Sequence, residues 1–360
     1  MTSAELAQAL LGAVRERDFG ATPDTMQGGA PVADFPSIDL ALAAFPVRQA
    51  PVFANVLFSR DFPHGFVADI DAKRGGPVRN VHYLADLRDA ELRSIAWLPG
   101  ADWSRMDWRT LAGGAGGPRF VAPYPASLLK MMVAVGVALQ AEAGRIDWPD
   151  AELEAMITTS DDAATTELVA LLHRLDGIAL LHRRLADWGL ATLRLDGTQS
   201  DGGWGNAAGA GVGMIQMTAW DSVRLMWLLE DAGDAPPPPW LAPGIELLAA
   251  ASRARLHGWM AAQRRNEILS SSSLREVPGW VRGLPDDEVE FAHKTGTTEN
   301  YASDAGIVRA RPPLRRHYVV AVLTNLGTRY APDSRCATTW RLPALGAAID
   351  AALAPWLEAA

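Results

Sequence analysis

The order of strand-like and helix-like segments is the feature of this 360-residue chain that most constrains its fold. Strand-like runs lie near both ends, at 52–59, 65–70, 79–84, 289–295, 303–309 and 317–324. Helical patterns fill the middle and the very end, at 127–143, 161–175, 178–188, 218–230, 246–262 and 338–358. This order predicts a sheet lobe assembled from both ends of the chain, with a helical lobe inserted into it.

Residues 1–50 are predicted to form an N-terminal extension. Within 4–18, one side of a helical pattern carries the apolar residues Leu6, Leu10, Leu11 and Val14. Residues 20–50 are rich in Pro, Gly and Ala, which indicates an extended lead-in with little helix. The start lacks the features of a signal peptide, and no stretch is apolar for about 18 residues. We therefore expect a cytoplasmic protein, or a periplasmic or secreted one if a signal has been removed.

Composition argues against several classes of function. The net charge of −9 gives no electrostatic support for binding nucleic acid. A single cysteine, Cys336, rules out an internal disulfide and a cysteine metal cluster. The seven histidines show no ligand spacing, so we expect neither a metal nor another cofactor.

Lysine is rare in this chain, which contains only three lysines beside thirty arginines. Lys130 closes the tetrapeptide Ser-Leu-Leu-Lys, and Lys294 opens Lys-Thr-Gly, whereas Lys73 falls in a polar turn. Arginine cannot accept a proton under ordinary conditions, but lysine can when its surroundings lower its pKa. Lys130 and Lys294 are therefore candidates for proton chemistry.

Ser127 and Lys130 lie three residues apart at the start of a predicted helix, so both side chains share one face. A serine hydroxyl becomes a good nucleophile when a neighbouring base takes its proton. An N-cap serine followed by an ordinary helix lysine would give the same pattern. The apolar run 131–135 after Lys130 instead indicates that this lysine enters a buried segment.

Two further motifs carry polar groups at the ends of predicted elements. Ser160, Asp161 and Asp162 begin the helix at 161–175, where they also suit simple capping. Lys294, Thr295 and Gly296 end a predicted strand, where a glycine would let a ligand approach the backbone. A strand running into a turn is the alternative interpretation.

Together the three motifs occur in the order S-x-x-K, S-D-x, K-T-G, and the chain thereby resembles the serine β-lactamase and penicillin-binding protein (DD-peptidase) superfamily, class A above all. The resemblance extends over about 60–360. It includes the approach to the serine at 120–127, the strands at 305–308 and 318–322, and the C-terminal helix.

The resemblance implies an α/β (α+β) fold of the β-lactamase/transpeptidase type, with an antiparallel sheet lobe. It places the sheet lobe at 51–126 plus 281–360, the helical lobe at 127–280, and the active site between them. It implies that Ser127 is the acylated nucleophile, that Lys130 is its base, and that Ser160 relays a proton to the leaving nitrogen. Lys294, Thr295, Gly296 and the backbone of Thr297 would hold a substrate carboxylate and shape the oxyanion hole.

The sequence departs from the family pattern in three places. Asp162 stands where the family has asparagine, and an ionised aspartate only accepts hydrogen bonds. Gln199 falls near the position of the glutamate that activates water in class A enzymes, with Asp196 and Asp201 as alternatives. Ser160 follows Ser127 by 33 positions (160 − 127), fewer than in typical class A enzymes, which predicts a trimmed, more open helical lobe.

These features predict a serine hydrolase that forms an acyl-enzyme on amide or ester carbonyls, in the first place a β-lactamase-like enzyme. A D-alanyl-D-alanine carboxypeptidase, a promiscuous esterase and a β-lactam-binding sensor are the alternatives. The expected partner is a small molecule or peptide with a carboxylate. Nucleic acid and membrane partners are not expected.

Overall fold

The computed structural model describes residues 1–87, 89, 94–204, 214–230, 235–270, 289–310, 315–332, 334 and 336–358. Its longer helices are α1 (Ser3–Arg15), α2 (Lys130–Glu142), α3 (Asp150–Glu154), α4 (Asp162–Arg174), α5 (Gly177–Asp187), α6 (Ala219–Leu228), α7 (Ala250–Ala261) and α8 (Arg341–Glu358). The main strands are β3 (Ile38–Ala44), β4 (Val52–Ser59), β5 (Phe62–Val67), β11 (Val289–Thr297), β12 (Ala302–Ala310) and β13 (His317–Thr324). Short strands are β1 (Pro23–Asp24), β2 (Ala30–Pro31), β6 (His82–Ala85), β7 (Thr110–Ala112), β8 (Arg119–Ala122), β9 (Arg194–Leu195) and β10 (Ile215–Gln216).

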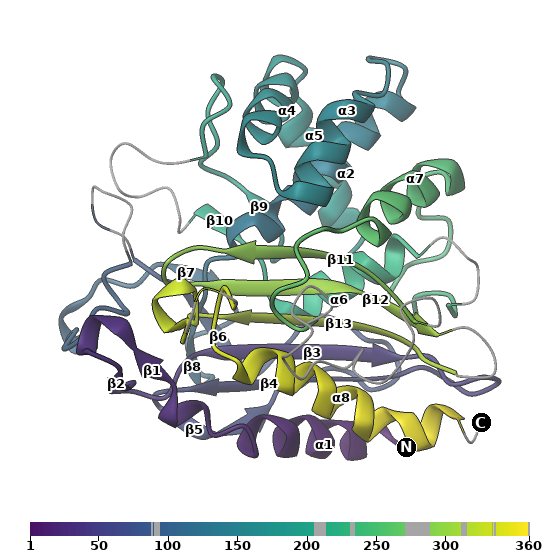
Figure 1. Ribbon diagram of the computed structural model, residues 1–360. Helices are drawn as coiled ribbons and strands as arrows, with labels where there is room; N and C mark the ends of the chain where they lie inside the picture. The colour runs from purple at the N-terminus through teal and green to yellow at the C-terminus, as the bar shows by residue number, and fades with distance from the viewer. Residues whose placement is uncertain are drawn as a thin grey trace.

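A six-stranded antiparallel sheet is the centre of the fold (Figure 1). Its strand order is β11-β12-β13-β3-β4-β5, so strands from the two ends of the chain meet where β13 pairs with β3. The predicted sheet lobe built from both ends, with helices inserted, is confirmed. The predicted strand at 79–84 forms instead as β6 in a separate three-stranded sheet with β7 and β8.

Helices cover both faces of the large sheet. α1 and α8 lie together on one face, and α6 packs on the other against β3, β12 and β13. α2, α3, α4 and α5 gather beyond the β11 edge in Figure 1, with α7 against β11. Side chains of α1, α8 and the sheet form one apolar core, and the opposite face of the sheet shares a second core with α2 and α6.

The strand β3 corrects the prediction of a structureless lead-in over residues 20–50. It pairs with β13 on one side and β4 on the other, and all its residues are buried. Leu40 and Leu42 face the core shared with α1 and α8, while Ala41 and Ala43 face the other core. Alanine is poor in strands when judged by local preference, so the pattern concealed a strand that tertiary burial on both faces stabilises. The predicted amphipathic helix at 4–18 is confirmed as α1.

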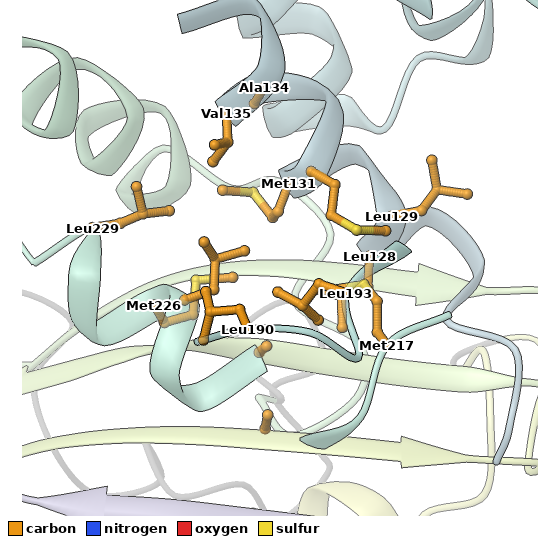
Figure 2. Packing of buried hydrophobic residues seen from close by; sticks show 14 of the residues in the cluster. Leu128, Leu129, Met131, Ala134, Val135, Leu190, Leu193, Met217, Met226 and Leu229 are labelled. Carbon is orange, nitrogen blue, oxygen red and sulfur yellow. The ribbon is translucent and has the colours of Figure 1, made fainter. Parts of the chain in front are cut away.

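The helix α2 is buried on nearly every side, as expected for a helix that is apolar all round. Figure 2 shows Leu128, Leu129 and Met131 at its start, in one cluster with Leu193 and Met217. This packing holds the start of α2 in a fixed position.

The remaining helix and strand predictions agree with the structure to within a few residues, and Thr218 caps α6 as predicted. The division into two lobes stays a proposal, because its second boundary falls at 271–288, outside the described residues. No helix of the described residues is long and apolar enough to cross a membrane.

Candidate active site

Ser127 lies on a 3-10 turn, Ala126–Leu129, that leads directly into α2. The predicted helix start is therefore corrected: the α-helix begins at Lys130, and the turn before it is tighter. Side chains three residues apart eclipse one another in a 3-10 turn, so Ser127 and Lys130 still share one face. Ala126 has a left-handed backbone with φ 50° and is buried, a strained conformation that the packing around it sustains.

Lys130 is buried and surrounded by acceptors from the Ser160 motif. Its Nζ lies 2.6 Å from Asp162 Oδ1, 2.7 Å from the Ser160 carbonyl oxygen and 3.2 Å from Ser160 Oγ. These three acceptors match the three N–H groups of an ammonium ion. The predicted entry of Lys130 into a buried segment is confirmed, since only 1% of the residue is exposed.

Ser160 follows a single π-helical turn, Ala155–Thr159, which joins the end of α3 to the start of α4. Ser160 itself has a left-handed backbone, with φ 62° and ψ 38°. This kink turns its carbonyl oxygen and its hydroxyl toward Lys130. Asp161 then caps α4, because its side chain accepts a hydrogen bond from the Ala164 amide at 2.8 Å.

Lys294 reaches the same serine from the strand β11. Its Nζ donates to Ser160 Oγ at 3.0 Å and to the Thr295 carbonyl oxygen at 2.7 Å. Lys294 is fully buried and Thr295 is 5% exposed. Ser160 Oγ thus lies between two lysine ammonium groups that come from distant parts of the chain.

Burial and mutual repulsion govern the two lysines. Burial is the main cause that lowers the pKa of Lys130, and hydrogen bonding and charge from Asp162 act in the opposite direction. Burial also holds the pKa of Lys294 well below its usual value, and the charge of Lys130 adds to this effect. A buried lysine beside another cation loses proton affinity, which is the condition for a lysine base.

Gly296 brings β11 against the turn that carries Ser127. A Cβ atom at Gly296 would lie 2.5 Å from the Pro125 carbonyl oxygen and 2.7 Å from the Leu128 amide nitrogen. Ser303 Oγ on β12 donates to the Pro125 carbonyl, which ties the same turn to the sheet. Glycine is therefore required here for the close approach of two backbones.

Thr297 ends β11 one residue beyond this contact, opposite Ala302 of β12. Its amide is therefore the neighbour of the Ser127 turn, where an oxyanion hole is expected.

Asp162 begins α4 and has a largely exposed side chain, 74% accessible, although Oδ1 contacts the buried Lys130. The departure from the family's asparagine therefore places a carboxylate on the candidate base itself.

Gln199 lies on an exposed turn beside α4. Its amide donates to the Gly203 carbonyl at 2.7 Å, and a Cβ at Gly202 would lie 2.1 Å from the Thr166 carbonyl oxygen, one turn along from Asp162. Of the two alternatives, Asp196 is paired with Arg194 through both carboxylate oxygens, and Asp201 accepts from the Gly203 amide. The glycine-rich continuation over 205–213 lies outside the described residues.

Sequence reasoning missed two residues that connect the site. Gln263 donates from Nε2 to the carbonyls of Ile157 and His293, which precede Ser160 and Lys294 respectively. Arg265 donates to the Thr159 carbonyl at 3.3 Å, and its charge contributes to the lowered pKa of both lysines. Neither residue belongs to a motif, so only the folded chain reveals them.

Trp103 and Trp108, which were candidates for an apolar groove, stack in a ladder with Trp97. The guanidinium of Arg60 lies over the Trp103 ring at 4.5 Å. This arrangement accounts for them as packing. Among the described residues, no group of three or more His, Cys, Asp or Glu side chains is placed to hold a metal ion.

Comparison with known proteins places this site in a family. The Beta-lactamase enzyme family matches residues 150–339, which are 190 of the 360 residues. The match includes Ser160 and Lys294 and begins after Ser127 and Lys130. No curated protein matches the chain.

Solved structures show the same fold at low identity. The chain is similar to a β-lactamase from Sphaerobacter thermophilus, with 14% identity, a TM-score of 0.52, and coverage of 96% of this chain and 97% of that chain. A mutant of PBP-A in an acyl-enzyme complex with penicillin G gives 17% identity, a TM-score of 0.48, and coverage of 97% and 96%. Because the family match spans more than half of its residues, this chain belongs to the beta-lactamase enzyme family.

Proposed function

We propose that the chain is a serine hydrolase that forms an acyl-enzyme on Ser127, with β-lactams as its leading substrates. One observation carries the proposal: two buried lysines from separate segments converge on Ser160 Oγ, at 3.2 Å from Lys130 and 3.0 Å from Lys294. Burying two cations around one hydroxyl is costly unless the arrangement serves chemistry.

The proposed roles follow from this arrangement. Neutral Lys130 takes the proton of Ser127 Oγ as that oxygen bonds to the substrate carbonyl carbon. The amides of Ser127 and Thr297 stabilise the oxyanion. The carbonyl carbon–nitrogen bond then breaks, and Ser160 passes a proton from the lysines to the leaving nitrogen. Thr295 and the charge of Lys294 favour a carboxylate on the leaving side.

Hydrolysis of the acyl-enzyme is the step that separates the candidate functions. Gln199 cannot act as a general base, and the carboxylate of Asp196 is engaged by Arg194. These observations favour a long-lived acyl-enzyme, as in a D-alanyl-D-alanine carboxypeptidase or a β-lactam sensor, over rapid class A turnover. An esterase remains the third candidate, because water has open access along the exposed turn at Gln199.

Intact-protein mass spectrometry over time after addition of benzylpenicillin tests the proposal, with Ser127→Ala as the control. A covalent adduct on the natural chain that is absent from Ser127→Ala supports the nucleophile. An adduct that disappears within seconds indicates a β-lactamase, and one that lasts for hours indicates a carboxypeptidase or sensor. Labelling of Ser127→Ala would overturn the assignment, and no labelling would leave an esterase or peptidase that rejects β-lactams.

A further inference from the structure

The carboxylate of Asp162 is the most unusual group beside the candidate nucleophile. Its Oδ1 is occupied by Lys130 Nζ at 2.6 Å, whereas Oδ2 makes no hydrogen bond to any residue that the structure describes. The side chain is 74% exposed, so the second oxygen is open to solvent. A carboxylate has about four lone-pair positions, so Asp162 can accept a second donor without releasing Lys130.

The charges around Asp162 make it a distinctive position in the site. Lys130, Lys294 and Arg265 supply positive charge around Ser160. The neighbouring acid Asp161 uses Oδ1 to cap α4. Asp162 is therefore the exposed anionic group that touches the candidate base, and it offers acceptors where an asparagine would also offer donors.

We infer that Asp162 determines specificity on the acyl side of the substrate, by selecting acyl donors that carry an unblocked amine. An ammonium group on the acyl part would donate to Oδ2 in a charge-assisted hydrogen bond. An acyl part that presents only a carbonyl oxygen to this position would meet another acceptor and be repelled. This inference rests on the proposed acylation of Ser127.

With Asp162 on the acyl side and Lys294 and Arg265 as cations nearby, the site complements a zwitterion. The substrate class is an amide, ester or lactam with an amine on its acyl part and a carboxylate on its leaving part. A purely structural Asp162, which only neutralises Lys130, would affect all substrates to the same extent. The two roles therefore differ in a ratio of rates rather than in a single rate.

Ampicillin and benzylpenicillin provide the matched pair, because they differ by one amine on the acyl side chain. The measurement is the second-order rate constant for adduct formation on Ser127, followed by intact-protein mass spectrometry. The proteins are the natural chain, Asp162→Asn and Glu167→Gln. Glu167 is an exposed acid on the same helix, with no printed role at the lysines and no hydrogen bond among the described residues, so its variant controls for loss of one negative charge.

In the natural chain and in Glu167→Gln, we expect ampicillin to react about tenfold faster than benzylpenicillin, as suits one charge-assisted hydrogen bond at a partly exposed site. In Asp162→Asn, the preference disappears or reverses. The same comparison on the natural chain with N-acetylated ampicillin needs no substitution, and acetylation should remove the preference.

Three results would overturn the inference. An equal ratio in the natural chain and Asp162→Asn, with both compounds labelling Ser127, contradicts the role of Asp162 and leaves the proposed function standing. Retention of the preference by N-acetylated ampicillin contradicts it in the same way. Failure of every compound to label Ser127 in any of the three proteins overturns the proposed function and this inference with it.

Discussion

Gly296→Ala tests whether the contact between β11 and the Ser127 turn sets the geometry of the site. A Cβ at this position would lie 2.5 Å from the Pro125 carbonyl oxygen, 2.6 Å from Ser303 Oγ and 2.7 Å from the Leu128 amide nitrogen. Two of these three atoms are backbone, so no side-chain rotation can relieve them. To reach even 3.0 Å from the Pro125 oxygen, the strand and the turn must separate by at least 0.5 Å (3.0 − 2.5).

This separation moves the Thr297 amide away from Ser127. A misplacement of 1 Å in an active site can cost about 100-fold in rate, so 0.5 Å predicts a loss of roughly tenfold in acylation. The measurement is the rate constant for adduct formation with benzylpenicillin. Substrate binding through Lys294 should change less, since that side chain precedes the contact in β11.

Gly65→Ala is the matched control for strain in the sheet. Gly65 lies on β5, at the opposite edge of the sheet from β11, and a Cβ there would lie 2.4 Å from the Phe58 ring. This variant should lose stability and keep its acylation rate. If Gly296→Ala folds and acylates within about threefold of the natural chain, the close approach is not what positions the oxyanion hole.

Three further substitutions test the electrostatics of the fold and the site. Burial raises the pKa of Asp39 to about 6 from an ordinary value near 3.8, so its contribution to stability is full below about pH 4 and is lost as the pH rises through about 6. The stability of Asp39→Asn relative to the natural chain should therefore rise by about 3 kcal/mol between pH 4 and pH 8 in urea unfolding, and parallel curves for the two proteins, or the same slope in the exposed control Asp107→Asn, would refute this. Lys130→Arg should slow acylation at least about 100-fold, because arginine does not act as a base, and near-normal stopped-flow kinetics would contradict that role. Gln199→Glu should shorten the lifetime of the adduct in mass spectrometry, and an unchanged lifetime would mean that this turn does not hold the deacylating water.

Local patterns were sufficient where one residue type or one period carried the signal. The alternating and apolar runs gave β4, β11, β12 and β13 to within a few residues, and the order of these elements predicted the sheet built from both ends. The two motif lysines were recognisable because lysine is otherwise nearly absent from the chain.

Local patterns failed where the decisive contact lies far away in sequence. β3 is a strand because β13, β4 and the helices on both faces enclose it, and its own composition favours no strand. Gln263 and Arg265 matter because folding places them beside the carbonyls that precede Ser160 and Lys294.

The sequence by itself determined the chemical groups of the site: one serine three residues before a lysine, a second serine at a helix start, and a lysine before a glycine on a strand. Only the tertiary structure decided how these groups are charged and joined. It brings Lys294 to within 3.0 Å of Ser160 across 134 positions of sequence and sets Asp162 against Lys130. Burial and neighbouring charge control proton affinity, and both depend on the folded surroundings rather than on residue identity.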